Sequence, residues 1–221
     1  MRLRLPEERP TEPPTGYKIA RPVLSHDGTR AGFTGVSLGG ALPYGVLDEA
    51  RCVYGRRHRA PHRRCDCGFH CVHDRATAEA LLCTAEHRGA ALLEVTVLGA
   101  YIRFERGFRY ARQRVRTATL PACACGAAAP LLADAGWGRP GWRVVEAVCG
   151  RCRGGRRALA VAEFGRLAGE GLRVVAAAPA PYIGEGAGLG MPELMAEAAL
   201  LQARLDWFQE ELARFTGDQR G

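Results

Sequence analysis

Four of the nine cysteines in this chain of 221 residues lie in two short pairs, and their spacing constrains the fold more than any other feature. One residue separates the first pair, two separate the second, and a glycine that suits a tight turn adjoins each. Zinc takes four soft ligands at about 2.3 Å in a tetrahedron, and a site closed by four cysteines is structural. The alternative is four free thiols. The sequence therefore predicts one structural zinc site, formed by Cys123, Cys125, Cys149 and Cys152.

A strand expected over residues 142–148 would deliver the second cysteine pair to the first. This arrangement resembles a zinc ribbon, a class in which zinc stabilises a small sheet. Ribbons usually have two residues between the cysteines of each pair, whereas Cys123 and Cys125 have one between them. The resemblance is to the class, and it implies a structural site.

A second group of cysteines and histidines lies between residues 52 and 73. Three readings stay open for it: a second zinc site, structural cysteines beside surface histidines, or a catalytic cluster. With only three protein ligands, a metal here could activate a water molecule. The zinc reading is a site with three cysteines and one histidine, formed by Cys52, His62, Cys65 and Cys67.

The run from His62 to Phe69 reads His-Arg-Arg-Cys-Asp-Cys-Gly-Phe. It resembles an element of uncharacterised proteins from high-GC, actinobacterial-type bacteria, in which a Cys-x-Cys-Gly turn precedes a helix and a strand. An arginine- and aromatic-rich segment follows there, as residues 94–112 do here. The resemblance covers about a quarter of the chain and implies architecture only, because no activity is attached to that family.

The composition is that of an ordinary globular protein, with 47% hydrophobic and 24% charged residues. Residues 1–14 lack the apolar run of a signal peptide, and no apolar stretch is long enough to span a membrane. We therefore expect a cytoplasmic protein without membrane contact, whose cysteines favour metal sites over disulfides. Lys18 is the only lysine beside 30 arginines, a bias typical of GC-rich genomes.

The net charge of +8 permits an acidic partner such as nucleic acid. Six arginines and four aromatic residues lie between residues 101 and 116, which suits phosphate contacts with base stacking. The alternative is a solvated strand face in an arginine-biased chain. The predicted contacts with nucleic acid or another polyanion are Arg103, Arg106, Arg109, Arg112, Arg114 and Arg116.

Residues 191–217 are expected to form one helix with an apolar seam of heptad spacing. An isolated helix of this length is marginal in water, so something must cover the seam. Pairing with a protein partner or a second copy, as in a coiled coil, and docking onto the chain's own body both remain open. The seam consists of Leu194, Ala198, Leu201, Leu205, Phe208, Leu212 and Phe215.

The predicted fold class is α+β, with small mixed or antiparallel sheets, zinc-stabilised loops and the C-terminal heptad-patterned helix. Asp74 should cap a helix reaching about residue 88, a strand should cover residues 92–105 with a bulge at Gly99, and a second helix residues 157–168. The predicted parts are a disordered arm (1–14), an α+β domain (15–120), a ribbon-like subdomain (121–177), a linker (178–190) and the helix (191–217).

These features favour an intracellular binding or adaptor protein that contains one or two zinc ions and assembles through its terminal helix. The chain carries no phosphate-binding loop and no serine in a nucleophile elbow, which disfavours the standard hydrolase and kinase routes. The alternative is an enzyme, a metal-dependent hydrolase or transferase, with its site near Cys52 to His73.

Overall fold

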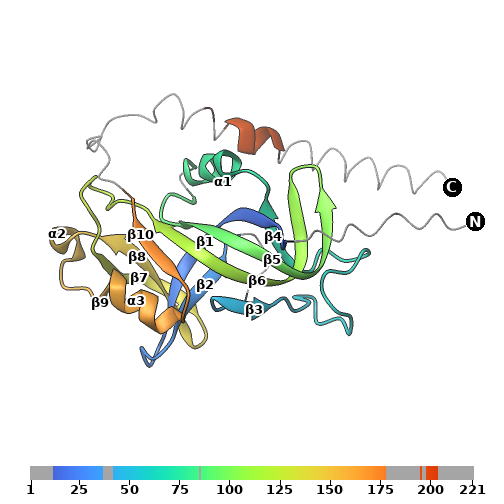
Figure 1. Cartoon of the computed structure of the whole chain (residues 1–221). Coiled ribbons are helices and arrows are strands. Elements are labelled where there is room, and N and C mark those ends of the chain that lie inside the picture. The colour runs from blue at the N-terminus through green and yellow to red at the C-terminus, as the bar shows by residue number, and fades with distance from the viewer. Residues whose placement is uncertain (1–11, 37–41, 85, 178–194, 196–197, 204–221) are drawn as a thin grey trace, which may run out of the picture.

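Two strands of 14 residues, β5 (Ala91–Phe104) and β6 (Gly107–Leu120), form a long antiparallel hairpin through the centre of the computed structural model (Figure 1). The structure describes residues 12–36, 42–84, 86–177, 195 and 198–203. The first half of β5 is buried on both faces, because its leucines and valines pack against layers on each side. The tip of the hairpin is exposed.

The remaining strands and helices are short apart from the first strand. In chain order they are β1 (Thr15–Ser25), β2 (Ala31–Gly35), β3 (Leu47–Glu49), β4 (Phe69–Val72), α1 (Arg75–Leu82), β7 (Leu131–Arg139), β8 (Trp142–Val148), α2 (Gly150–Arg153), β9 (Ala158–Ala160), α3 (Val161–Ala168) and β10 (Arg173–Ala176).

Strand pairing closes a ring around one part of the core. β1 pairs with β5, β5 with β6, β6 with β4, and β4 returns to β1 through Tyr17 and Val72. All four pairings are antiparallel. The ring therefore brings β1 and β4, which are about 50 residues apart in the sequence, to the same wall of the molecule.

The main core lies between the long strands and α3. Phe33, Leu93, Tyr110 and Phe164 are fully buried in it, and the rings of Phe33 and Phe164 meet edge to face at 5.8 Å. A smaller cluster forms where Ala78 of α1 packs against β1 and β5. Helices α1 and α3 cover opposite sides of the long strands (Figure 1).

Two local predictions are confirmed. The register of the β5–β6 pairing shifts between Leu98 and Tyr101, and Gly99 between them has a φ of 71°, which favours glycine. Asp74 caps α1 by accepting hydrogen bonds from the backbone N–H groups of Ala76 and Thr77 at 2.8 and 3.0 Å. The helix ends at Leu82 and not near residue 88.

The predicted α+β class is wrong: the described residues form one ten-stranded, largely antiparallel sheet with two eight-residue helices, one helix of four residues and a short helical segment at 198–203. Strands from both halves of the chain join it, because β8 pairs with β1 and β10 pairs in parallel with β6. The expected helix over 157–168 begins only at Val161, since residues 158–160 pair with β7 as a strand.

Most of the predicted seam at 191–217 lies outside the described residues. Ala198 and Leu201 belong to the short helical segment 198–203, and both are exposed, Leu201 by 61%. A C-terminal heptad-patterned helix is therefore not part of the described fold. The seam residues that lie outside the description are Leu194, Leu205, Phe208, Leu212 and Phe215.

Candidate metal centres and the adjoining cavity

The four cysteines of the two short pairs lie together in the structure. We call Cys123, Cys125, Cys149 and Cys152 the four-cysteine centre; their sulfur atoms all lie within 4.8 Å of one another. The sulfurs of Cys125 and Cys149 are 3.7 Å apart. A tetrahedron with metal–sulfur bonds of about 2.3 Å has edges of about 3.8 Å, so this set could hold a metal ion.

Local structure aims these sulfurs at one another. The β7–β8 hairpin spans the interval between the pairs and leads directly into Cys149. At the first pair, the Gly126 N–H donates to the Cys123 carbonyl at 2.7 Å, and Gly126 has a φ of 81°. At the second, Cys149 caps the short helix α2, and its sulfur accepts a hydrogen bond from the Cys152 N–H at 3.4 Å.

The thiols of this centre do not titrate alike. The hydrogen bond from the backbone of Cys152 lowers the pKa of the Cys149 thiol to about 6. The sulfur contacts that Cys152 makes with Cys125, Cys149 and Cys123 raise the pKa of its own thiol to about 12. Thiolates at this separation repel one another, so a bound cation would be needed to ionise all four.

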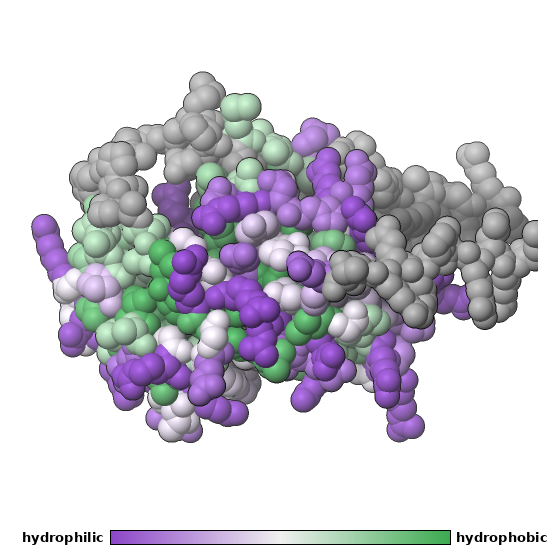
Figure 2. All heavy atoms as spheres, viewed as in Figure 1, coloured by the Kyte–Doolittle hydropathy of each residue, from purple (hydrophilic) through white to green (hydrophobic). Residues whose placement is uncertain are grey.

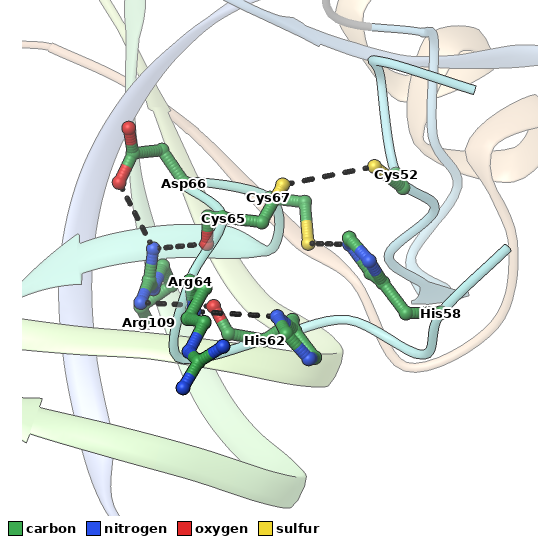
Figure 3. Close-up of polar contacts among 8 residues, drawn as sticks. All are labelled: Cys52, His58, His62, Arg64, Cys65, Asp66, Cys67 and Arg109. Carbon is green, nitrogen blue, oxygen red and sulfur yellow. Dashed lines mark hydrogen bonds and ion pairs between the residues drawn. The ribbon is translucent and has the colours of Figure 1, made fainter. Parts of the chain in front are cut away.

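A second cluster forms in the loop before β4, and we call it the Cys3His centre. Its ligand atoms, from Cys52, His58, Cys65 and Cys67, also lie within 4.8 Å of one another. The sulfurs of Cys52 and Cys65 are 3.8 Å apart, and Nε2 of His58 lies 3.2 Å from the sulfur of Cys67 (Figure 3). Cys65 and Cys67 are buried, whereas Cys52 and His58 are half-buried.

The histidine in this centre is His58, where the sequence suggested His62. Nδ1 of His62 accepts a hydrogen bond from the Arg64 N–H at 3.2 Å, so it belongs to its own turn. Its ring stacks on that of His58 with centroids 4.4 Å apart. The two remaining cysteines, Cys71 and Cys83, belong to neither cluster.

Arg109 ties the loop of the Cys3His centre to β6. Its guanidinium donates hydrogen bonds to the carbonyl of Cys65 at 2.6 Å and that of His62 at 3.4 Å, and it pairs with Asp66 at 3.2 Å (Figure 3). Only 6% of Arg109 is exposed. One of the six arginines predicted to contact a polyanion is therefore an internal anchor.

The other five arginines lie along the hairpin. Arg103 and Arg106 are exposed near its tip. Arg112, Arg114 and Arg116 share one face of β6, where the first and last are exposed and Arg114 is half-buried. Figure 2 shows hydrophilic residues scattered over the visible face and not gathered into one patch.

A cavity of about 700 Å³ adjoins the Cys3His centre. Residues next to two cysteines of this centre form part of its wall: Arg51 and Val53 flank Cys52, and Gly68 follows Cys67. Aliphatic and aromatic side chains make up much of the remaining wall, and the aromatic ones are Tyr17, Tyr44, Phe69, Phe104, Phe108 and Trp142. Its volume lies within the range of small-molecule sites.

Lys18 of β1 borders this cavity. Its ammonium nitrogen lies 4.8 Å from the ring centroid of Tyr44 and 5.0 Å from that of Phe69, so two aromatic faces flank the cation. Burial lowers the pKa of Lys18 from 10.5 to about 8, and the nearby Cys71 thiol opposes this shift. A desolvated amine in a cleft is a candidate functional group.

Lys18 was not among the predicted site residues, although the composition of the chain sets it apart. A chain that uses arginine at 30 of its 31 basic positions has one lysine, and that lysine lies in the cavity wall. Lysine differs from arginine in that its charge is a compact point on a flexible stem and it can lose its proton when buried.

No helix among the described residues is both long and apolar enough to cross a membrane. Compared with known proteins, the chain matches no family model, no curated protein and no solved structure.

Proposed function

We propose that this chain is a non-enzymatic binding protein in which two zinc ions hold loops in place and the cavity beside the Cys3His centre receives a ligand. One observation carries this proposal: residues that line the cavity are neighbours in the chain of residues in the metal cluster. Arg51 and Val53 lie on either side of Cys52, and Gly68 follows Cys67. A metal that fixes these two cysteines also fixes that wall.

Zinc is the metal that the two donor sets favour. Four cysteines, or three cysteines and one histidine, in a tetrahedral arrangement are the ligand sets of structural zinc sites. The resemblance to zinc ribbons supports the same role for the four-cysteine centre, where the β7–β8 hairpin lies between the cysteine pairs. Both ions would stabilise the fold, and neither would take part in chemistry.

The alternative of a metal-dependent hydrolase or transferase near Cys52 to His73 is less well supported. Catalytic zinc keeps a position open for water or substrate and has three protein ligands. Each of the two clusters brings four ligand atoms within 4.8 Å of one another, which leaves no such position.

Contact with nucleic acid or another polyanion is also less well supported as a function than ligand binding in the cavity. Arg109 is buried against the loop of the Cys3His centre, and by strand alternation it lies on the opposite face of β6 from Arg112. Assembly through residues 191–217 has little to rest on, because only Ala198 and Leu201 of its seam lie within the described residues.

Native mass spectrometry of the purified chain tests the metal content. We expect two zinc ions per chain in the wild type and one in each of the variants Cys67→Ser and Cys149→Ser, because each substitution removes one ligand of one centre. Cys83→Ser serves as the control and should retain both ions, since Cys83 lies in neither cluster. A wild-type chain with fewer than two ions would refute the proposal.

A further inference from the structure

The wall of the cavity combines a large apolar surface with three basic side chains, Lys18, Arg51 and Arg106, and two acidic ones, Asp48 and Glu49. Its aromatic side chains come from separate parts of the chain: Tyr17 from β1, Tyr44 from the loop before β3, Phe69 from β4, Phe104 and Phe108 from the β5–β6 hairpin, and Trp142 from β8. Such a wall gains most from a ligand with an aromatic or other apolar body, which it would remove from water.

The charge of Lys18 has no carboxylate to neutralise it among the described residues. Its ammonium group instead lies over the rings of Tyr44 and Phe69, and aromatic rings attract a cation without cancelling its charge. Asp48 also lines the cavity, but its carboxylate accepts hydrogen bonds from the backbone N–H groups of Gly45 and Glu49, at 3.0 and 2.7 Å. An anionic ligand would supply the missing charge.

We propose that the cavity binds a small organic anion, in which a carboxylate or sulfonate group is carried on an aromatic or other apolar body. The anionic group is held by the ammonium group of Lys18, and the body contacts the aromatic side chains of the wall. This inference rests on the proposed function as a binding protein and names the class of its ligand.

Binding of such an anion should weaken as the pH rises above about 8. The pKa of Lys18 is about 8 in the free protein, so its charge is lost above that value. Among its neighbours, the Cys71 thiol stays neutral between pH 6 and 9 because burial raises its pKa to about 11, and desolvation lowers the pKa of the His70 imidazole. The other ionisable groups that line the cavity are Tyr17, Tyr44, Asp48, Glu49, Arg51 and Arg106. The buried phenol of Tyr110 lies next to Cys71.

Two fluorescent probes with nearly the same aromatic body test this inference by titration. Anilinonaphthalene sulfonate carries an anionic group, whereas N-phenylnaphthylamine is neutral. We expect one sulfonate probe to bind per folded chain, with an affinity that falls at least tenfold in Lys18→Met. The neutral probe should bind the wild type more weakly and be unaffected by Lys18→Met.

Arg112→Met is the matched control, because it removes one positive charge from the outer face of β6 and leaves the cavity intact. It should leave both affinities unchanged. The inference is overturned if the wild type binds no sulfonate probe, or if Lys18→Met and Arg112→Met weaken its binding equally. Zinc counted in the same samples separates the two proposals: two ions without probe binding refute the ligand class, and fewer than two refute the proposed function.

Discussion

Replacing Cys149 by serine is expected to lower the free energy of unfolding by more than about 4 kcal/mol. Cys149 is a ligand of the four-cysteine centre and also caps α2 through its sulfur. Zinc bound to such a site stabilises the folded state directly, because the unfolded chain has no preformed site. Unfolding in urea can be followed by tryptophan fluorescence, to which Trp137 and Trp142 of the β7–β8 hairpin contribute.

Cys83→Ser provides the comparison. The Cys83 thiol donates to the carbonyl of Glu79 at 3.7 Å, and a serine hydroxyl can do the same, so its stability should stay within about 1 kcal/mol of the wild type. Removal of metal from the wild type by a chelator should reproduce the loss seen in Cys149→Ser. Equal stabilities of the two variants would show that no metal stabilises the four-cysteine centre.

Replacing Lys18 by methionine is expected to do the opposite and stabilise the protein at pH 7. The pKa of Lys18 is about 8 in the folded chain, against 10.5 for the free side chain. A difference of this size corresponds to about 3 kcal/mol of unfavourable desolvation. Loss of the contacts with Tyr44 and Phe69 offsets about 1 kcal/mol of that gain, which leaves a net stabilisation of about 2 kcal/mol.

The pH dependence identifies the cause. Below pH 8 the amine of Lys18 is charged in both the folded and the unfolded chain, so the wild type bears the full cost of burial. Between pH 8 and 10.5 the folded chain loses this proton while the unfolded chain still holds it, so wild-type stability rises relative to Lys18→Met. The difference between the two proteins, measured by urea unfolding at several pH values, should therefore close over this interval.

Lys18→Arg is the control, because a guanidinium keeps its charge at every pH used. It should be no more stable than the wild type at pH 7 and less stable at pH 10. If Lys18→Met is less stable than the wild type, or if the difference in their free energies of unfolding does not change with pH, then burial of the Lys18 charge does not destabilise the folded chain.

Short-range patterns in the sequence predicted local features well. The Asp74 cap depends on an acidic side chain two and three residues before free backbone N–H groups, and the bulge at Gly99 on a residue that tolerates positive φ. Within each cysteine pair of the four-cysteine centre, a local turn brings the two sulfur atoms to the same side, although the β7–β8 hairpin is needed to bring the two pairs together. These features are set by a few neighbouring residues.

Long-range pairing could not be predicted in the same way. The single sheet arises because β1 pairs with four strands from different parts of the chain, and no local pattern in residues 15–25 specifies those partners. The choice of His58 over His62 likewise depends on how the loop folds back over Cys67. The cavity requires β1, β4 and the hairpin to be placed together before Lys18 can be seen to border it.

Hydrogen exchange of the Cys67→Ser variant tests most directly whether a metal holds the wall of the cavity. Amide exchange should become faster across residues 50–70, which contain the ligands of the Cys3His centre and the wall beside them, and stay unchanged across residues 121–177. Cys149→Ser should show the reverse pattern. An unchanged exchange rate across residues 50–70 in Cys67→Ser, or an equal increase along the whole chain, would contradict a metal-supported cavity wall.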